Sequence, residues 1–256
     1  MITKHVSFSH EKGGATVTTA TVNVAWLLAQ KYRVLIIDTD TRGDCATSLG
    51  LPPAPGLTNF LLGDDLARNV VHTRHPSLDL LPCDATITAL HAGHNAELNA
   101  VSAISPAAAE RTRLAIIQRV ALMFKRIEEY DIILYDSKAS GAYIRLAAMS
   151  IADHLVIPTD LKTLGQADIP PILAVYGQRS FTIAPGLFDA RKGIQKAILA
   201  ALQDEYGDAV AAPVPNSVQI ENASNAGMPV VEFDPTGEPA KRYQALALIV
   251  ENSIYA

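Results

Sequence analysis

The chain has 256 residues, of which 49% are hydrophobic and 18% are charged, with a formal net charge of −5. This length and composition predict one large α/β domain over residues 1–256, and the charge excludes a basic surface overall, so any DNA contact must be a local patch. No apolar run approaches the roughly 18 residues of a spanning helix, and the N-terminus lacks a signal pattern. Two cysteines, Cys45 and Cys83, without metal-like spacing, indicate a reducing cytosol.

The first predicted element is a strand over residues 4–9. The segment 11–19, EKGGATVTT, follows it, and apolar residues at helical spacing predict a helix over 18–29. A strand, a glycine-bearing loop and a helix N-terminus together favour an anion, because free backbone N–H groups and the helix dipole converge there. We therefore expect a phosphate-binding loop at residues 12–19.

Three further apolar runs predict strands, and two of them end in acids. Residues 34–38 lack alternation, which is typical of a strand buried on both faces of a parallel sheet, and Asp38 and Asp40 follow at its carboxyl end. The run 130–136 likewise ends in Asp136. Ligands bind at the carboxyl ends of strands in such sheets. The other run, residues 78–82, reads as a strand ending in proline.

The rest of the chain alternates helices and strands. Residues 85–106 show only weak periodicity, and their His91 and His94 form either a surface pair, the favoured interpretation, or two metal ligands on a helix. The longest helical pattern, 107–129, has an apolar face that includes Leu114 and Phe124. The remaining predicted elements are helices at 141–152, 164–176, 189–206 and 240–251, and strands at 153–158 and 209–215.

The loop at 11–19 fails the strict pattern G-x-x-x-x-G-K-[ST]. It instead resembles the deviant Walker A box K-G-G-V-G-K-T-T of the ParA/MinD family, which it matches at Lys12, Gly13, Gly14, Thr18 and Thr19. Two departures affect the chemistry. Val17 replaces the lysine that contacts the β- and γ-phosphates, and Thr16 replaces a glycine that lets the loop approach them.

Two other segments resemble the same family. Residues 38–50 are similar to its D-x-D-P-Q-G-N-x-T-x-x-L-G motif, with departures that include Thr41, Arg42 and Asp44, and residues 130–136 are similar to its Walker B strand. The resemblance implies that Asp40 positions the attacking water. It also implies that Mg²⁺ is held by Thr18, Asp38 and Asp136. The alternative for Asp38 and Asp40 is a pair of solvated loop acids.

The resemblance continues to Leu246. It implies nucleotide contacts from the loop residues, including Ala15, and from Asp189 and Pro215 in two later segments. Residues 177–187 look shortened against the family, so 181–187 reads as the remnant of a strand on the adenine side. The implied fold is a P-loop NTPase of the deviant Walker type, with a twisted, mostly parallel sheet and helices on both faces.

The family also implies partners. An ATP-sandwich homodimer would place Lys12 on the partner's phosphates, the alternative being a solvated loop lysine. A ParB-like or cargo-adaptor protein would stimulate hydrolysis. Non-specific DNA binding would use a patch whose alternative is a scattered solvated surface; its candidates are Arg191, Lys192, Lys196, Lys241 and Arg242. The C-terminal tail has no basic face, which disfavours membrane docking and favours a cytoplasmic, nucleoid-associated protein.

Two functions remain open from the sequence. The first is a slow ParA-like ATPase that binds ATP and Mg²⁺ to position DNA or another cargo. The second is a pseudo-ATPase that keeps the fold as a binding scaffold. Lys138, two residues after Asp136, either restores the positive charge lost at Val17 or is an ordinary surface lysine.

Overall fold

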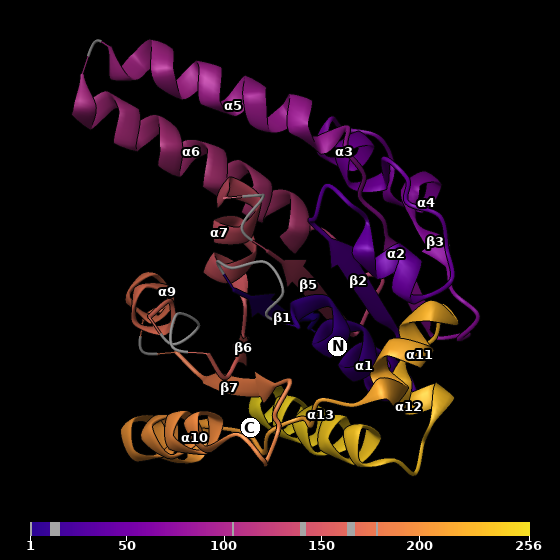
Figure 1. The fold of residues 1–256 in the computed structure, drawn as a ribbon. Helices are drawn as coiled ribbons and strands as arrows, with labels where there is room; N and C mark the ends of the chain where they lie inside the picture. Colours follow the sequence, from indigo (N-terminus) through magenta and orange to yellow (C-terminus); the bar gives the residue numbers. More distant parts are fainter. Residues whose placement is uncertain (1, 11–15, 104, 139–141, 163–166, 178) are drawn as a thin grey trace.

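The computed structural model describes residues 2–10, 16–103, 105–138, 142–162, 167–177 and 179–256. Its centre is a seven-stranded sheet in the order β3-β4-β2-β5-β1-β6-β7 (Figure 1). Neighbouring strands are parallel except for β3, which pairs antiparallel with β4 at one edge. The strands are β1 (Lys4–Ser9), β2 (Val34–Asp38), β3 (Val71–His72), β4 (Leu78–Leu81), β5 (Ile132–Ser137), β6 (His154–Asp160) and β7 (Phe181–Gly186).

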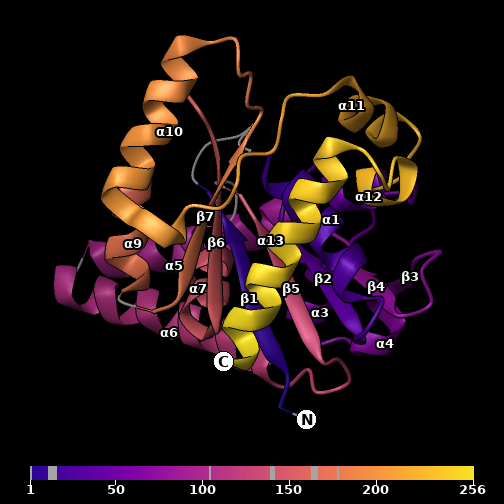
Figure 2. The ribbon, with the colours of Figure 1, turned by 90° about the horizontal axis from the view of Figure 1, so that it is seen from below.

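Helices connect the strands and cover both faces of the sheet (Figure 2). They are α1 (Val17–Leu28), α2 (Asp44–Ser48), α3 (Gly56–Leu61), α4 (Leu66–Asn69), α5 (Ile87–Ser102), α6 (Pro106–Lys125), α7 (Ala142–Ile151), α9 (Ile169–Tyr176), α10 (Gly193–Tyr206), α11 (Val218–Asn225), α12 (Val230–Phe233) and α13 (Glu238–Tyr255). The predicted α/β fold, a mostly parallel sheet between two layers of helices, is confirmed.

The strand β2 shows why its run of apolar residues has no alternation. Val34 and Ile36 pack in the core beneath α1 and α13, whereas Leu35 and Ile37 pack in the core beneath α6 and α7. A strand that is covered on both faces buries every side chain, so each position favours an apolar residue. A third core, formed with α9 and α10, lies at the β6–β7 side of the sheet.

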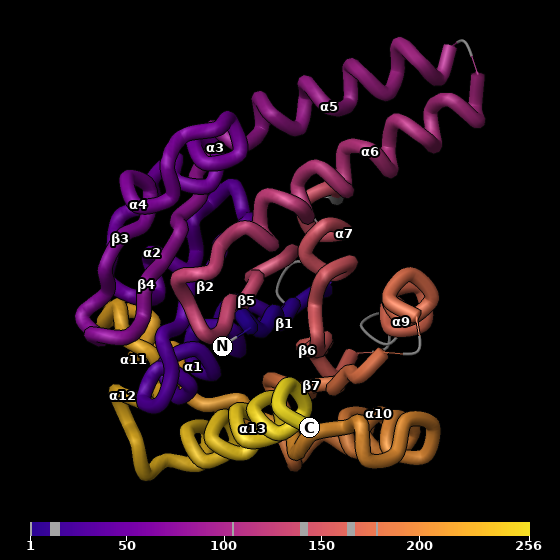
Figure 3. Tube along the Cα trace, turned by 180° about the vertical axis from the view of Figure 1, so that it is seen from behind, coloured from indigo at the N-terminus to yellow at the C-terminus, as the bar shows by residue number. Residues whose placement is uncertain are grey.

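Helices α5 and α6 form a long antiparallel hairpin that projects from the body (Figures 1 and 3). The buried residues of α6 begin at Ile116 and reach Phe124, so the half nearer the hairpin tip is largely solvated. Leu114 is 45% exposed, so its predicted place on the buried face is wrong. Only Ile87 and His94 of α5 are buried. A helix that buries so few residues has little apolar periodicity, which is why residues 85–106 show only a weak pattern.

The expected surface pair of histidines is wrong for His94, which is buried in the hairpin. Its ring meets Tyr143 edge-on at 5.7 Å between centroids, and Arg119 Nη2 lies 3.3 Å from its Nε2. Within the described ranges, no carboxylate or cysteine joins the two histidines to complete a metal-ligand group. His94 is therefore a packed core histidine.

Of the two strands predicted after α9, one is confirmed and the other is not. Residues 181–186 form a complete strand, β7, which pairs with β6 over six residues from Leu155↔Phe181 to Asp160↔Gly186. The predicted strand at 209–215 is wrong. That segment makes only two isolated bridges, Ile183↔Val210 and Phe188↔Pro215, so it runs beside the β7 edge without forming a ladder.

The last helix, predicted at 240–251, is confirmed as α13 and buries one face. Tyr243, Leu246, Ala247 and Val250 are all buried, and α13 packs along α1. The described part of the chain contains no helix that is both long and apolar enough to cross a membrane.

Candidate functional site

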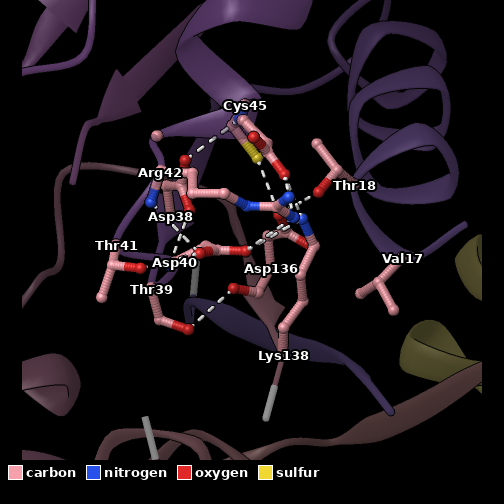
Figure 4. Close-up of polar contacts among 12 residues, drawn as sticks. Val17, Thr18, Asp38, Thr39, Asp40, Thr41, Arg42, Cys45, Asp136 and Lys138 are labelled. Carbon is pink, nitrogen blue, oxygen red and sulfur yellow. Dashed lines mark hydrogen bonds and ion pairs between the residues drawn. The ribbon is translucent and has the colours of Figure 1, made fainter. Parts of the chain in front are cut away.

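Two buried acids meet where β2 and β5 end. Asp38 and Asp136 are register partners in this parallel pair, and both side chains are fully buried (Figure 4). Thr18, in the first turn of α1, donates its hydroxyl to Asp136 Oδ2 at 2.7 Å. The predicted metal residues Thr18, Asp38 and Asp136 therefore lie together.

The carboxylate of Asp38 is held by backbone donors. Its Oδ1 accepts from Asp40 N at 2.9 Å, and its Oδ2 accepts from Cys45 N at 3.0 Å. Burial raises the pKa of Asp38 well above its ordinary value, and the charge of Asp136 raises it further. Burial likewise raises the pKa of Asp136. Two close buried carboxylates are costly without a cation, so the site is suited to bind one.

Cys45 also belongs to this group, a role that its spacing in the sequence did not predict. Its Sγ donates to Asp136 Oδ2 at 3.2 Å, and burial raises the pKa of the thiol well above its ordinary value. The ligand atoms of Asp38, Cys45 and Asp136 lie within 4.8 Å of one another. The thiol stays neutral and the other donors, including the Thr18 hydroxyl, are hard oxygens, so the group fits Mg²⁺. The position of Cys45 inside the 38–50 motif is the feature of the sequence that could have placed it at this site.

Lys138 lies over these acids and not on the outer surface. Its Nζ is 2.6 Å from Asp44 Oδ2 and 3.1 Å from Asp40 Oδ2, and only 8% of the residue is exposed (Figure 4). Burial lowers the pKa of Lys138, but the surrounding carboxylates, first Asp136, outweigh it and leave the pKa above its ordinary value. The interpretation as an ordinary surface lysine is therefore wrong, and Lys138 is a buried, charged ammonium.

Asp40 is ionised in this arrangement. Burial acts to raise the pKa of its carboxyl, but Lys138 outweighs burial and leaves the pKa below its ordinary value. Asp40 Oδ1 also accepts from Arg42 N at 3.1 Å. Since Asp40 is only 4% exposed, the alternative of a solvated loop acid does not describe it.

A pocket of about 390 Å³ opens beside this group. The start of α1, two cations and a carboxylate line it, together with four residues from elsewhere in the chain. The lining residues are Thr16, Val17, Thr18, Thr19, Arg42, Asp44, Thr47, Ser48, Lys138, Leu187 and Ser224. The structure thus brings four of the predicted loop residues and Lys138 to one cavity. Lys12, Gly13, Gly14 and Ala15 lie outside the described residues.

The first two described loop residues depart from a phosphate loop in different ways. Thr16 adopts the left-handed conformation, with φ of 61°, that a glycine would take without strain. Val17 is 2% exposed and packs in the core beneath α1. Val17 therefore supplies no charge to the pocket.

The predicted nucleotide contacts Asp189 and Pro215 lie in a second hollow of about 510 Å³. Phe188 lines this hollow, whereas the preceding residue, Leu187, lines the first pocket. Asp189 forms an ion pair with Arg191 at 2.9 Å.

The predicted basic patch is partly neutralised. Arg191 pairs with Asp189, and Lys241 and Arg242 both approach Glu238, at 3.6 and 3.4 Å. Lys192 and Lys196, at the start of α10, are exposed, and no carboxylate pairs with them among the described ion pairs. The positive charge of the patch that no carboxylate pairs with therefore comes from Lys192 and Lys196.

Comparison with known proteins identifies the family of this chain. Residues 3–179 match the AAA domain family. The chromosome-partitioning ATPase Soj of Thermus thermophilus is 26% identical over 257 residues, which cover 95% of this chain and 94% of Soj. The chromosome partitioning protein ParA of Caulobacter vibrioides is 25% identical over 258 residues, covering 94% and 91%.

Solved structures show the same fold. The ATP complex of a McdA variant from Cyanothece superposes with a TM-score of 0.79 at 19% identity, covering 98% of this chain and 97% of that one. The septum site-determining protein MinD of Pyrococcus horikoshii, solved with Mg-ADP, gives a TM-score of 0.72 at 20% identity, covering 97% and 96%. The chain therefore belongs to the AAA domain family, among its ParA/MinD-like P-loop ATPases.

Proposed function

We propose that this chain is a ParA-like positioning protein that binds a magnesium nucleotide in the pocket at the start of α1. The observation that carries the proposal is Lys138, a buried ammonium that lines the pocket and contacts Asp40 at 3.1 Å. It supplies the positive charge that Val17 does not. The relatives Soj and ParA are named as chromosome-partitioning proteins, which supports the same class of function.

Each residue has a role in this proposal. Thr18, Asp38 and Asp136 hold Mg²⁺, which neutralises charge on the phosphates when it is bound. Lys138 and Arg42 contact phosphate oxygens, and the N–H groups at the start of α1 add the helix dipole. Asp40, ionised and nearly buried, orients a water for attack. The second hollow at Asp189 and Pro215 receives the base or ribose.

The positioning role adds two partners. A homodimer formed across the nucleotide would bring Lys12 to the partner's phosphates, and a ParB-like or adaptor protein would stimulate hydrolysis. DNA would bind through Lys192 and Lys196, with the paired arginines contributing when their carboxylates are displaced. The apolar face of α13 packs on α1, and Ile254 near its end is 3% exposed, so this face is not available to a membrane.

Calorimetry with Mg-ATP tests the nucleotide part. The native chain should bind, and Lys138→Ala should weaken binding roughly tenfold to hundredfold, since a charge-assisted hydrogen bond is worth about 1.5–3 kcal/mol. Lys31→Ala, which removes an exposed lysine paired with Glu251 far from the pocket, is the matched control. Equal affinities of the Lys138→Ala and native chains would exclude the role of Lys138.

The pseudo-ATPase alternative is favoured by one observation. Both pocket cations are already engaged by carboxylates, Lys138 by Asp44 and Asp40, and Arg42 by Asp44. In that case the chain is a scaffold that keeps the fold without turnover. Steady-state phosphate release with Mg-ATP separates the two functions. Turnover that disappears in Asp40→Ala supports the ATPase, and its absence in the native chain supports the scaffold.

A further inference from the structure

One carboxylate oxygen holds both cations of the pocket. Asp44 Oδ2 lies 2.6 Å from Lys138 Nζ and 2.8 Å from Arg42 Nη2. Asp44 begins α2 after Gly43, whose φ of 64° turns the chain at this point. Its side chain is 33% exposed, so the contact lies at the wall of the cavity and not beneath it.

The carboxylate of Asp44 takes the place between the two cations that a bound anion would take. The side chains that line the pocket include two cations, Arg42 and Lys138, and one carboxylate, Asp44. Among the lining residues that the structure describes, Lys138 and Arg42 are the only lysine and arginine, so phosphate oxygens would draw on the same donors. The Asp44 carboxylate and a phosphate would therefore compete for the hydrogen bonds that Lys138 and Arg42 donate.

We propose that Asp44 is an internal competitor for the nucleotide: its carboxylate occupies Lys138 and Arg42 in the empty site and must release them when phosphate binds. The inference rests on the proposed nucleotide site and adds the residue that limits its affinity. Asp44 positions the two cations and touches no reacting atom.

The cations do not depend on Asp44 alone. Lys138 keeps Asp40 at 3.1 Å, and Arg42 Nη2 lies 3.6 Å from the same Asp40 oxygen. Removing the charge at position 44 therefore leaves the cations beside the pocket while freeing their donors. Asparagine is the informative replacement, because it keeps the size of the side chain and removes its charge. It is also the residue that the resembling motif has at this position.

Calorimetric titration with Mg-ATP tests the proposal. Asp44→Asn should bind about tenfold or more tightly than the native chain, a gain that loss of a structural contact does not produce. Adding Lys138→Ala to Asp44→Asn should abolish the gain. Glu110→Gln, which removes a surface ion pair with Arg113 on α6, is the matched control and should leave affinity unchanged. Asp44→Ser serves as a second variant if Asp44→Asn does not fold.

The outcomes separate this inference from the proposed function. If the native chain binds and neither position-44 variant binds more tightly, the competitor role is overturned while the nucleotide site stands. If the native chain does not bind but Asp44→Asn does, the competitor role is supported and the native chain is a scaffold. If no variant binds, both proposals are wrong.

Discussion

Thr16 lies directly against Gly186, the last residue of β7. A Cβ atom built on Gly186 would be 2.7 Å from Thr16 Oγ1 and 3.2 Å from Thr16 Cγ2. Thr16 occupies a left-handed conformation that disfavours a β-branched residue, and the missing side chain at Gly186 provides the space for it. The two positions therefore form one packing unit that joins the loop to the edge strand.

This unit predicts non-additive mutations. Gly186→Ala should destabilise the chain by about 1–3 kcal/mol through overpacking, and the cost should fall when Thr16 is changed to glycine as well. Urea unfolding of the two single variants and the double variant measures the coupling. An equal cost of Gly186→Ala in both backgrounds would show that the two residues do not act on each other.

Restoring the family lysine should not restore a phosphate site. Val17 is 2% exposed in the core beneath α1, so Val17→Lys should lower the free energy of unfolding by about 2–3 kcal/mol. Val17→Met, which adds length without charge, is the control and should cost less. Urea unfolding measures the stability, and Mg-ATP calorimetry measures the affinity. A stable Val17→Lys variant that binds far more tightly than the native chain would contradict the assignment of phosphate charge to Lys138.

Lys192 and Lys196 should carry the DNA contact. Changing both to glutamate should weaken binding to duplex DNA and reduce the slope of log K against log salt by about 2, roughly 0.9 for each phosphate contact. Arg111→Glu on α6 with Arg126→Glu directly after it, two exposed charges, is the matched control. Fluorescence anisotropy across a salt series gives both quantities. A larger loss of DNA affinity in the Arg111→Glu, Arg126→Glu variant would indicate that DNA binds at the α5–α6 hairpin instead.

Acid should destabilise the chain through buried histidines. Burial lowers the pKa of His154 from 6.5 to about 4, and its nitrogens lie 2.9 Å from Ser180 Oγ and 3.0 Å from Thr182 Oγ1. The folded state thus keeps His154 neutral while the unfolded state takes up a proton. The stabilisation is complete above pH 6.5 and is lost as the pH falls toward 4, by about 3 kcal/mol at most.

Urea unfolding between pH 7 and about pH 4 measures this dependence. His154→Gln should flatten the curve in part, because His5, whose pKa burial also lowers to about 4, still titrates. His72→Gln is the control, since the His72 side chain is 87% exposed. Identical pH profiles for His154→Gln and the native chain would mean that the unfolded and folded states protonate this residue alike.

The sequence predicted the sheet and the meeting of the acids well, for a physical reason. Runs such as 34–38 and 130–136 are apolar without alternation because both faces of their strands are covered, and parallel strands bring their carboxyl ends to one edge. The pattern therefore placed Asp38 and Asp136 at the same edge of the sheet, and the family resemblance implied that they share one site. The loop was recognisable because helix spacing resumes directly after its glycines.

Other features depended on contacts that no local pattern records. Helix α5 buries few residues, so its periodicity was weak, and Leu114 fits the helical spacing but lies where the hairpin has left the body. Cys45 and Asp136 are 91 positions apart, and Asp44 and Lys138 are 94 apart. The sequence could suggest that Lys138 supplies charge at the site, but it could not show that Asp44 pairs with it.

Asp136 lies near the end of β5 and Lys138 directly follows that strand, so only the fully buried Ser137 separates them. In the proposed site Asp136 would bind the metal and Lys138 the phosphate, so the two proposed ligands are tied to each other by two residues of backbone. We therefore expect heterotropic cooperativity: Mg²⁺ that fixes Asp136 also fixes Lys138, and nucleotide that engages Lys138 prepares Asp136. By thermodynamic reciprocity, each raises the affinity for the other by the same factor.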